Sequence, residues 1–423
     1  MTMHIVQRAT DGLVPYARNA CTHSPEQVAL LAASIREWGW TNPILIDGEN
    51  RILAGHGRLA AAKSLGMTVV PCVVLGAMSE AQRRAYILAD NQLAARAGWD
   101  TDLLALELGE LKALGFDLDL TGFEPDDLLR LLGPDAGGGL TDDDEAPACP
   151  DSPVSAPGDL WRCGEHRVLC GDALSMADMA RLMDGAQADL IISDPPYNVA
   201  YAGKSKRRLT ITNDAMSAVA FYRFLLDAFT MMFAVAADGA GAYVFHSDVE
   251  GANFRRAFSD AGFRFAQCCV WVKSTFVLGR KDYQIQHEPV LYGWKPGDAH
   301  RWYGDRRQSS VWNFDRPAAS DLHPTMKPVA MVEYAVLNSS RSGELVLDPF
   351  AGSGTALVAC EKTGRCARVL EIDPRYCDVT VRRWQDWTGK KAIREDGLAF
   401  DEAGGERRAH GPAHGYSASS IPA

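Results

Sequence analysis

Two apolar segments of the sequence end in the same way, with an acidic residue followed by a proline. Residues 188–194 read ADLIISD and lead into Pro-Pro-Tyr, and residues 344–350 read ELVLDPF and lead into a glycine-rich turn. Short apolar runs bounded by turn residues are typical of strands buried on both faces of a parallel sheet. Helical patterns at 221–236 and 331–340 alternate with them. The second part of the chain is therefore predicted to be an α/β protein with a doubly wound sheet.

A segment poor in apolar residues separates this part from the first third of the chain. Residues 134–159 are rich in Gly, Pro and Asp, with seven acidic residues and no basic one. They have too little apolar surface to offset the entropy of ordering, so we expect an extended acidic linker. A similar composition predicts a disordered tail at 396–423. We expect two folded domains beside the linker, at 1–133 and 160–395.

The net charge of −11 does not exclude a nucleic-acid partner, because the acidic residues are concentrated at the front of the chain. Residues 1–133 hold 11 basic and 16 acidic residues, whereas residues 161–423 hold 32 basic and 31 acidic residues. A local basic surface on the second domain is compatible with these numbers. We find neither a signal-peptide pattern nor an apolar run of ~20 residues, and we expect a cytoplasmic protein without a membrane partner.

The ten cysteines form no Cys-x-x-Cys pair, and no Cys/His cluster has zinc spacing. We therefore expect reduced, mostly buried thiols and no metal site. His410 and His414 lie in the predicted tail, where we expect solvated side chains rather than metal ligands.

A glycine-rich turn follows the second apolar strand and leads into an apolar helix. In Asp348-Pro-Phe-Ala-Gly-Ser-Gly-Thr355, the glycines would let a ligand approach the backbone and the helix N-terminus. Glu371 ends the next strand, 17 residues beyond Gly354, at about the distance where an acid reaches ribose hydroxyls. Many α/β proteins use such a turn only for packing. The strand, the helix and the acid together favour a nucleoside-type cofactor.

The first apolar strand ends in Asp194-Pro195-Pro196-Tyr197. In open α/β sheets, ligands bind at the carboxyl ends of the strands. The two prolines restrict the backbone and hold an acid and an aromatic ring in a fixed relation. A structural turn is the alternative, but such a turn rarely needs this combination of residues. We predict that this motif is catalytic.

The two motifs resemble those of DNA methyltransferases that modify an amino group, adenine N6 or cytosine N4. The resemblance covers about residues 160–394 and includes His323-Pro-Thr-Met-Lys-Pro328 and Gly171-Asp172-Ala173. The catalytic motif precedes the cofactor motif, as in the β group, so the resemblance implies a Rossmann-like domain with permuted motif order. It implies S-adenosylmethionine as the cofactor. The residues that it places at the cofactor are Asp172, Thr325, Lys327, Asp348, Phe350, Gly352, Gly354 and Glu371.

The resemblance also implies a mechanism. Asp194 and the Pro195 carbonyl would accept the two N–H groups of the target amine, whose freed lone pair attacks the methyl group in line. Tyr197 would stack on a base flipped out of the duplex. An Asp at the first position favours adenine N6, and cytosine N4 is the alternative. Cytosine C5 chemistry is rejected, because the only Pro-Cys pair, Pro71-Cys72, lies in an apolar strand of the first domain.

Two basic segments are candidates for contacts with double-stranded DNA. One follows the catalytic motif in a loop that could instead be merely solvated. The other lies within residues 254–316, which hold 11 basic and 6 acidic residues where the family carries its target-recognition segment. A homodimer is left open. The predicted DNA-binding residues are Lys204, Lys206, Arg207, Arg208, Arg301, Arg306 and Arg307.

Residues 5–75 resemble the ParB/sulfiredoxin fold, with Gly55-His56-Gly57-Arg58 at the start of a helix. In relatives this turn handles nucleotide phosphates or carries the sulfiredoxin cysteine, and His56 and Gly57 stand where that cysteine is expected. Arg58 could bind an anion or only stabilise the loop. We expect a small α/β accessory domain for DNA targeting or nucleotide sensing. The alternative from another class is a partition-type DNA-binding protein with a degenerate enzyme domain, which the intact motifs disfavour.

Overall fold

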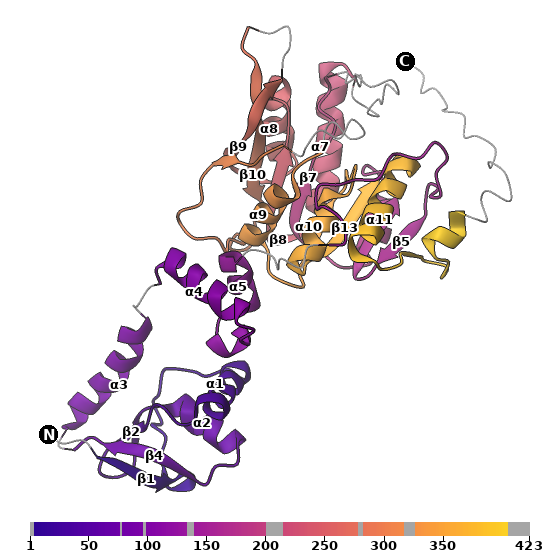
Figure 1. Ribbon diagram of the computed structural model, residues 1–423. Helices are drawn as coiled ribbons and strands as arrows, with labels where there is room; N and C mark the ends of the chain where they lie inside the picture. Colours follow the sequence, from indigo (N-terminus) through magenta and orange to yellow (C-terminus); the bar gives the residue numbers. More distant parts are fainter. Residues whose placement is uncertain are drawn as a thin grey trace. The chain divides into compact units, whose positions relative to one another are not determined.

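The computed structural model describes residues 4–76, 78–95, 99–132, 139–199, 215–277, 282–316 and 326–404. The chain divides into two compact units, Met1–Gly133 and Pro134–Ala423, each with its own core (Figure 1).

The first unit contains a four-stranded sheet in the order β1-β4-β2-β3, in which β2 and β4 are parallel and the outer pairs are antiparallel. Ser24 caps the first helix by accepting a hydrogen bond from the Gln27 N–H (3.2 Å). Aliphatic residues of the sheet, such as Ile44 and Ile52, pack against Leu59 of the second helix. The elements are β1 (Ile5–Ala9), η1 (Thr10–Gly12), α1 (Pro25–Trp38), β2 (Ile44–Ile46), β3 (Ile52–Ala54), α2 (His56–Ser64), β4 (Val69–Val74), α3 (Glu80–Ala95), α4 (Thr101–Ala113), η2 (Leu118–Thr121) and α5 (Pro125–Leu132).

The second unit is built on a ten-stranded sheet in the order β11-β9-β10-β8-β7-β12-β13-β6-β5-β14. Its central strands, from β8 to β6 in this order, are parallel, while β10 runs antiparallel to both β8 and β9. The strands are β5 (Leu160–Cys163), β6 (His166–Cys170), β7 (Ala188–Ser193), β8 (Ala236–Phe245), β9 (Arg264–Val277), β10 (Ile285–Trp294), β11 (Val311–Asn313), β12 (Leu345–Asp348), β13 (Cys366–Glu371) and β14 (Ile393–Arg394).

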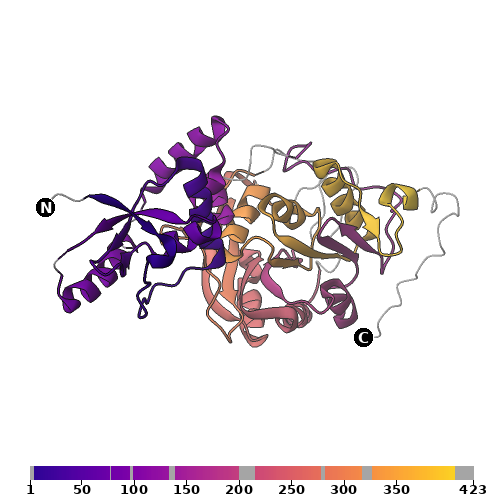
Figure 2. The same cartoon turned by 90° about the horizontal axis from the view of Figure 1, so that it is seen from below.

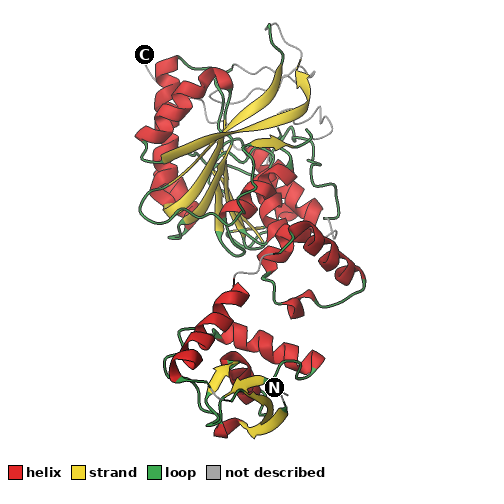
Figure 3. Cartoon of the chain, turned by 90° about the vertical axis from the view of Figure 1, so that its left-hand side faces the viewer, coloured by secondary structure: helices red, strands yellow, loops and turns green. Residues whose placement is uncertain are grey.

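Helices cover both faces of this sheet, as Figures 2 and 3 show. Alternate residues of β7 enter opposite cores: Leu190 packs with α9 to α11, and Ile191 packs with α6 to α8. This alternation explains why the strand sequence is apolar throughout, and it confirms the predicted doubly wound α/β fold. The helices are α6 (Met176–Met183), α7 (Ala218–Val235), η3 (Asp248–Glu250), α8 (Gly251–Asp260), α9 (Val329–Ser339), α10 (Thr355–Thr363) and α11 (Pro374–Thr388).

Among the described residues, one helix, α7, is long and apolar enough to cross a membrane. Its Phe221, Leu225 and Phe229 are fully buried in the core of the second unit. A core helix passes the same test of length and composition, so this signal is weak.

The segment at 139–157, which we call the acidic strap, packs on the second unit instead of forming an extended linker. Trp387 lies against Gly139 so closely that an added Cβ would be 2.3 Å from its ring. Cys149 is buried, and the backbone N–H groups of Val154 and Ser155 donate to the Asp378 carboxylate. The linker prediction was wrong here because composition counts the acidic residues but not the cations and backbone donors that pair with them.

The end of the chain is ordered further than predicted. Phe400 is buried and contacts the Trp161 ring at 5.0 Å between centroids, and Ala403 is buried as well. The rest of the predicted tail, residues 405–423, lies outside the described residues.

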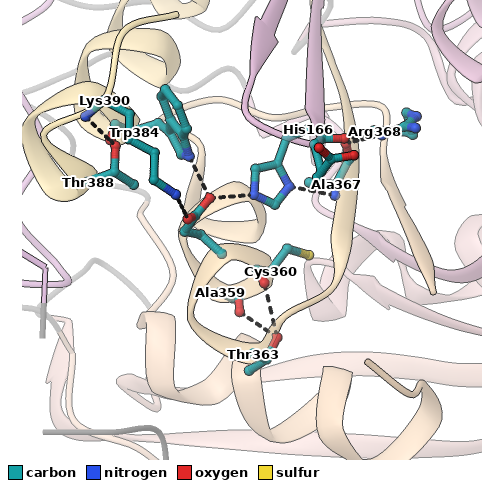
Figure 4. A network of polar contacts seen from close by, with 11 residues as sticks. His166, Ala359, Cys360, Thr363, Ala367, Arg368, Trp384, Thr388 and Lys390 are labelled. Carbon is teal, nitrogen blue, oxygen red and sulfur yellow. Dashed lines mark hydrogen bonds and ion pairs between the residues drawn. The ribbon is translucent and has the colours of Figure 1, made fainter. Parts of the chain in front are cut away.

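A polar network fastens β6 to α10 and α11 (Figure 4). The Glu361 carboxylate accepts hydrogen bonds from Trp384 Nε1 (2.9 Å) and Lys390 Nζ (2.8 Å) and lies 2.8 Å from His166 Nε2. His166 Nδ1 accepts the Ala367 N–H (2.9 Å), so the proton of its neutral ring lies on Nε2 and is donated to Glu361. The hydrogen bond from His166 and the other two donors hold the pKa of Glu361 at about 2.

Candidate active site

The predicted motifs meet at one edge of the sheet because they end neighbouring parallel strands. Asp194 follows β7, Asp348 ends β12, Glu371 ends β13, and Gly171-Asp172 follows β6. These four strands are adjacent in the order β7-β12-β13-β6, so their carboxyl ends line the same edge. The Gly171 N–H donates to the Glu371 carbonyl (3.0 Å) and joins two of the segments directly.

Asp194 lies at the centre of a compact cluster of polar side chains. Lys327 Nζ donates to its Oδ2 at 2.7 Å, and the Tyr197 hydroxyl donates to its Oδ1 at 2.5 Å. The Tyr197 ring meets Phe254 edge-on at 6.4 Å between centroids. Both prolines of the motif are at least half-buried, and the motif holds the acid and the ring together as the sequence predicts.

Two further charged residues, which the sequence analysis missed, complete the cluster. Glu288 of β10 lies 2.5 Å from the Tyr197 hydroxyl and 2.9 Å from Lys327 Nζ. Lys273 of β9 pairs with the other oxygen of Glu288 at 2.9 Å. Glu288 opposes Trp271, two residues before Lys273, in the register of the β9–β10 pair. A sequence signal existed, because opposite charges stand inside two apolar strands where burial requires that they be paired.

The cluster shifts the pKa values of its two carboxyl groups, Asp194 and Glu288, in opposite directions. Burial raises the pKa of Asp194, and the Glu288 charge raises it further, against the opposing effect of Lys327. Burial also opposes ionisation of Glu288, but Lys327 and Lys273 hold its pKa at about 2. Burial lowers the pKa of Lys327, yet the two carboxylates bring it to about 12. Lys327 and Glu288 are thus charged at neutral pH, and Asp194 is the carboxyl group that most readily accepts a proton.

Two buried acidic side chains belong to the neighbouring glycine turn and to the strand that follows its helix. Burial raises the pKa of Asp348 to about 8 and that of Glu371 to about 7. Gly352 donates its N–H to Glu371 (2.8 Å) and has a positive φ of 55°, with open space where a Cβ would point. Gly354 instead packs against Thr380, where a Cβ would come within 2.8 Å. Buried carboxyl groups beside an open glycine fit a ligand that brings positive charge and hydroxyl donors.

The remaining predicted cofactor residues are placed as follows. Phe350 lies beside Phe224, with 6.1 Å between ring centroids, and the exposed Asp172 accepts the Leu174 N–H at 2.9 Å. Lys327, expected at the cofactor, contacts Asp194 and Glu288, and its contact with a cofactor stays a prediction. Thr325 and the basic residues Lys204, Lys206, Arg207 and Arg208 lie outside the described residues.

Arg301, predicted to contact DNA, lies at the opposite edge of the sheet. It forms ion pairs with Asp189, at the start of β7, and with Glu344, just before β12. Two acids at the strand starts have Arg301 as their counter-ion, and its predicted contact with DNA stays a prediction. Arg306 and Arg307 are exposed in the following loop, which is tied by a hydrogen bond from Tyr303 to the last turn of α9.

Comparison with family models gives three matches along the chain. A DNA methylase family matches residues 188–382, a ParB N-terminal domain matches 15–91, and a ParB-methyltransferase HTH domain matches 102–157. The last of these domains was not predicted from the sequence. It covers α4, α5 and the acidic strap.

Individual proteins match as well. The chain is 51% identical over 82 residues to the ParB-like nuclease domain-containing protein YnaK of Escherichia coli K12 (19% of this chain and 94% of YnaK). It is 27% identical over 249 residues to the DNA adenine methyltransferase YhdJ of the same organism (51% of this chain and 81% of YhdJ). Among solved structures, the cytosine-N4-specific PvuII DNA methyltransferase matches with 15% identity and a TM-score of 0.41, covering 55% of this chain and 88% of its own.

Proposed function

Since this chain belongs to the DNA methylases of the N6/N4 family and carries ParB-type domains in front of the methylase domain, we propose that it methylates adenine N6 in double-stranded DNA. The observation that carries the proposal is the position of Asp194, held by Lys327 and Tyr197 beside the acidic glycine turn. We infer that Asp194 contacts the target amine and that the turn holds the methyl donor.

The methyl donor of this family is S-adenosylmethionine, which supplies an electrophilic methyl group on a sulfonium. The residues of the turn fit it. Asp348 and Glu371 have pKa values raised by burial, so a nearby cation and hydroxyl donors would stabilise their ionised forms. We infer that Glu371 accepts ribose hydroxyls, that Asp348 faces the cationic end, and that the open face of Gly352 admits the ligand. Asp172 is assigned to the adenine side.

The catalytic cluster is suited to an amine that becomes a nucleophile and then loses a proton. The Asp194 carboxylate and the Pro195 carbonyl accept the N–H groups of the amine, which frees the nitrogen lone pair. The amine must replace Lys327 in part of its contact with Asp194. Lys327 then remains paired with Glu288. The raised pKa of Asp194 makes this carboxylate the natural acceptor of the released proton. Tyr197 offers its ring for stacking on the flipped base.

Two observations favour adenine over cytosine N4. The first residue of the catalytic motif is Asp194, and YhdJ, a relative over half the chain, is described as a DNA adenine methyltransferase. Cytosine N4 is the second candidate, since its exocyclic amine requires the same chemistry. We assign phosphate contacts to Lys204, Lys206, Arg207 and Arg208, an accessory DNA-targeting role to the ParB-type unit, and a cytoplasmic location to the protein.

One experiment tests the proposal directly. The chain is expressed in a host without DNA methylation, and modified bases are mapped across the genome by single-molecule sequencing. We expect N6-methyladenine in one sequence context, and none with the Asp194→Ala variant. N4-methylcytosine would replace the adenine assignment. A chain that leaves DNA unmodified and shows no S-adenosylmethionine binding by calorimetry would favour the degenerate-enzyme alternative.

A further inference from the structure

The acidic strap carries five acidic residues and no basic one, yet it is fastened to the methylase domain at several points. Asp143 pairs with Lys362 of α10 (2.5 Å) and accepts a hydrogen bond from Trp387 Nε1 of α11 (2.9 Å). Lys362 also pairs with Glu333 of α9 (2.6 Å). One carboxylate of the strap therefore joins the three helices on this face of the sheet.

A second strap carboxylate caps the helix that follows Lys327. The Val329 N–H at the start of α9 donates to Asp144 Oδ1 at 2.8 Å, across 185 residues of sequence. The N-cap residue of this helix, Pro328, has no side chain that could form this bond, so a distant residue supplies the cap. Capping by a carboxylate also complements the positive end of the helix dipole. Because Val329 is two residues from Lys327, Asp144 holds the backbone next to the lysine that contacts Asp194.

The strap reaches the glycine turn as well. Arg383 of α11 is almost completely buried, and its Nη2 donates to the Asp143 carbonyl at 2.7 Å. Its Nη1 donates to the Ser353 carbonyl (3.0 Å) and to Thr355 Oγ1 (3.3 Å), both within the turn that we assign to the cofactor. A single side chain, that of Arg383, thus links the strap to the cofactor turn.

Apolar contacts of the strap reinforce these polar ones. Ala146 and Cys149 are buried in one small cluster with Met326 and Val379. Met326 directly precedes Lys327 in the sequence. The strap therefore contacts both sides of the lysine: Met326 before it and Val329 after it.

We propose that the acidic strap is a positioning element of the methylase site, in which Asp144 and Asp143 hold Lys327 and the glycine turn in their working geometry. The active unit then begins near residue 139, well before the segment matched by the methylase family at 188. This inference rests on the proposed function, because it assigns the strap to the same site.

The match of this region to an HTH domain raises the alternative that it binds DNA. Residues 102–157 hold 14 acidic and 2 basic residues. A surface of this charge repels the phosphate backbone, on which most protein–DNA affinity depends. The pairing of the Asp143 carboxylate with Lys362 and the hydrogen bond from Arg383 to the Asp143 carbonyl agree instead with a role inside the protein.

Substitutions in the full-length protein test the proposal. Asp144→Ala removes the cap of α9, whereas Asp144→Asn keeps an oxygen that can accept the Val329 N–H. The matched control is Glu145→Ala, which removes an exposed charge from the same strap. Loss of a cap corresponds to about a fivefold change in an equilibrium constant. We therefore expect Asp144→Ala to weaken S-adenosylmethionine binding about fivefold in calorimetry and to lower kcat, with both values restored in Asp144→Asn and unchanged in Glu145→Ala.

Equal cofactor affinity and turnover in Asp144→Ala and the wild type would overturn the proposal while leaving the methylase function in place. If Asp144→Ala does not fold, Asp143→Asn carries the test, because it removes only the charge that faces Lys362 and the same direction of change is expected. Hydrogen exchange of the backbone around Val329, measured without ligand, should accelerate in Asp144→Ala and not in Asp144→Asn. Unchanged exchange overturns the strap's role even if the wild-type protein proves to bind no cofactor.

Discussion

The two ends of strand β7 carry similar groups of charges but hold them in different ways. At the carboxyl end, Asp194 and Glu288 share Lys327, and at the amino end, Asp189 and Glu344 share Arg301. The difference lies in the other donors.

Backbone groups complete the hydrogen bonding at the amino end. The Leu345 N–H donates to Asp189 (2.8 Å), and the Arg341 N–H donates to Glu344 (2.7 Å). Asp194 is held by the side chains of Lys327 and Tyr197. A side chain can give up its contact to a substrate by changing rotamer, whereas a backbone donor can move only if the chain around it moves. The amino-end cluster is therefore a fixed structural element, and the carboxyl-end cluster can exchange partners during a reaction.

The difference between the two ends of β7 predicts that the largest change in activity separates Asp194→Ala from Asp189→Ala. Loss of the group that orients the amine should lower kcat by about 10³-fold, with cofactor affinity within a few-fold of the wild type. Asp189→Ala should lower the free energy of unfolding and leave most of the activity of the folded fraction. Methyl transfer to DNA, calorimetry and denaturant unfolding measure the three quantities. Near-normal turnover in Asp194→Ala would contradict the proposed mechanism.

Glu288→Gln tests whether the second carboxylate acts on the first. Since it helps to position Tyr197 and Lys327, its replacement should lower kcat about tenfold to a hundredfold. The Glu288 charge raises the pKa of Asp194, so its removal lowers that pKa. Asp194 must be ionised to accept the amine, and the acidic limb of the kcat–pH profile should therefore move to lower pH. A profile that keeps its wild-type position would show that Glu288 supports the structure without tuning Asp194.

The third prediction concerns the amino-end cluster itself. Arg301→Ala leaves two carboxylates without their counter-ion and should lower the free energy of unfolding by about 2 kcal/mol, less than a fully buried pair because a quarter of each side chain is exposed. We expect DNA affinity and its salt dependence to remain unchanged. A flatter salt dependence would return Arg301 to the DNA interface.

The sequence was sufficient for the fold and for the motif residues, because strands buried on both faces and motifs at their carboxyl ends leave local signals. Asp194, Asp348 and Glu371 meet for the reason that the sequence analysis gave. Glu288 and Lys273 were missed because their pairing depends on the register of two strands, which no local pattern fixes. The ion pairs of Arg301 could not be predicted, because a count of basic residues does not show at which end of a strand a side chain lies.

The strap also depends on contacts with residues distant in the sequence, and these contacts decide whether its ordering is favourable in free energy. An isolated acidic segment cannot offset its ordering entropy, and that argument correctly describes the segment alone. It fails for Asp143 and Asp144 because Lys362, Arg383 and the start of α9 supply cations and a free N–H group from elsewhere in the fold.

The smallest predicted effect is on the salt dependence of DNA affinity, and it tests at which end of the strands the DNA binds. Replacing Lys204, Lys206, Arg207 and Arg208 with alanine removes four charges from the segment after the catalytic motif. If they contact phosphates, DNA affinity should fall at low salt for cognate and random DNA alike. The slope of log affinity against log salt concentration should then flatten by roughly one unit per lost contact, because fewer counter-ions are released.

The matched control for this prediction is the double replacement of Arg306 and Arg307 with alanine, which removes two exposed charges from the loop tied to the last turn of α9. Because that turn leads into the edge opposite Asp194, we expect no change in the salt slope. Cofactor affinity should remain unchanged in both variants, since neither touches the glycine turn. The opposite outcome is a salt slope that is unchanged in the fourfold variant and flatter in the double variant. It would place the DNA at the amino ends of the strands. The flipped base could not then reach Asp194, and the proposed geometry of the whole site would be wrong.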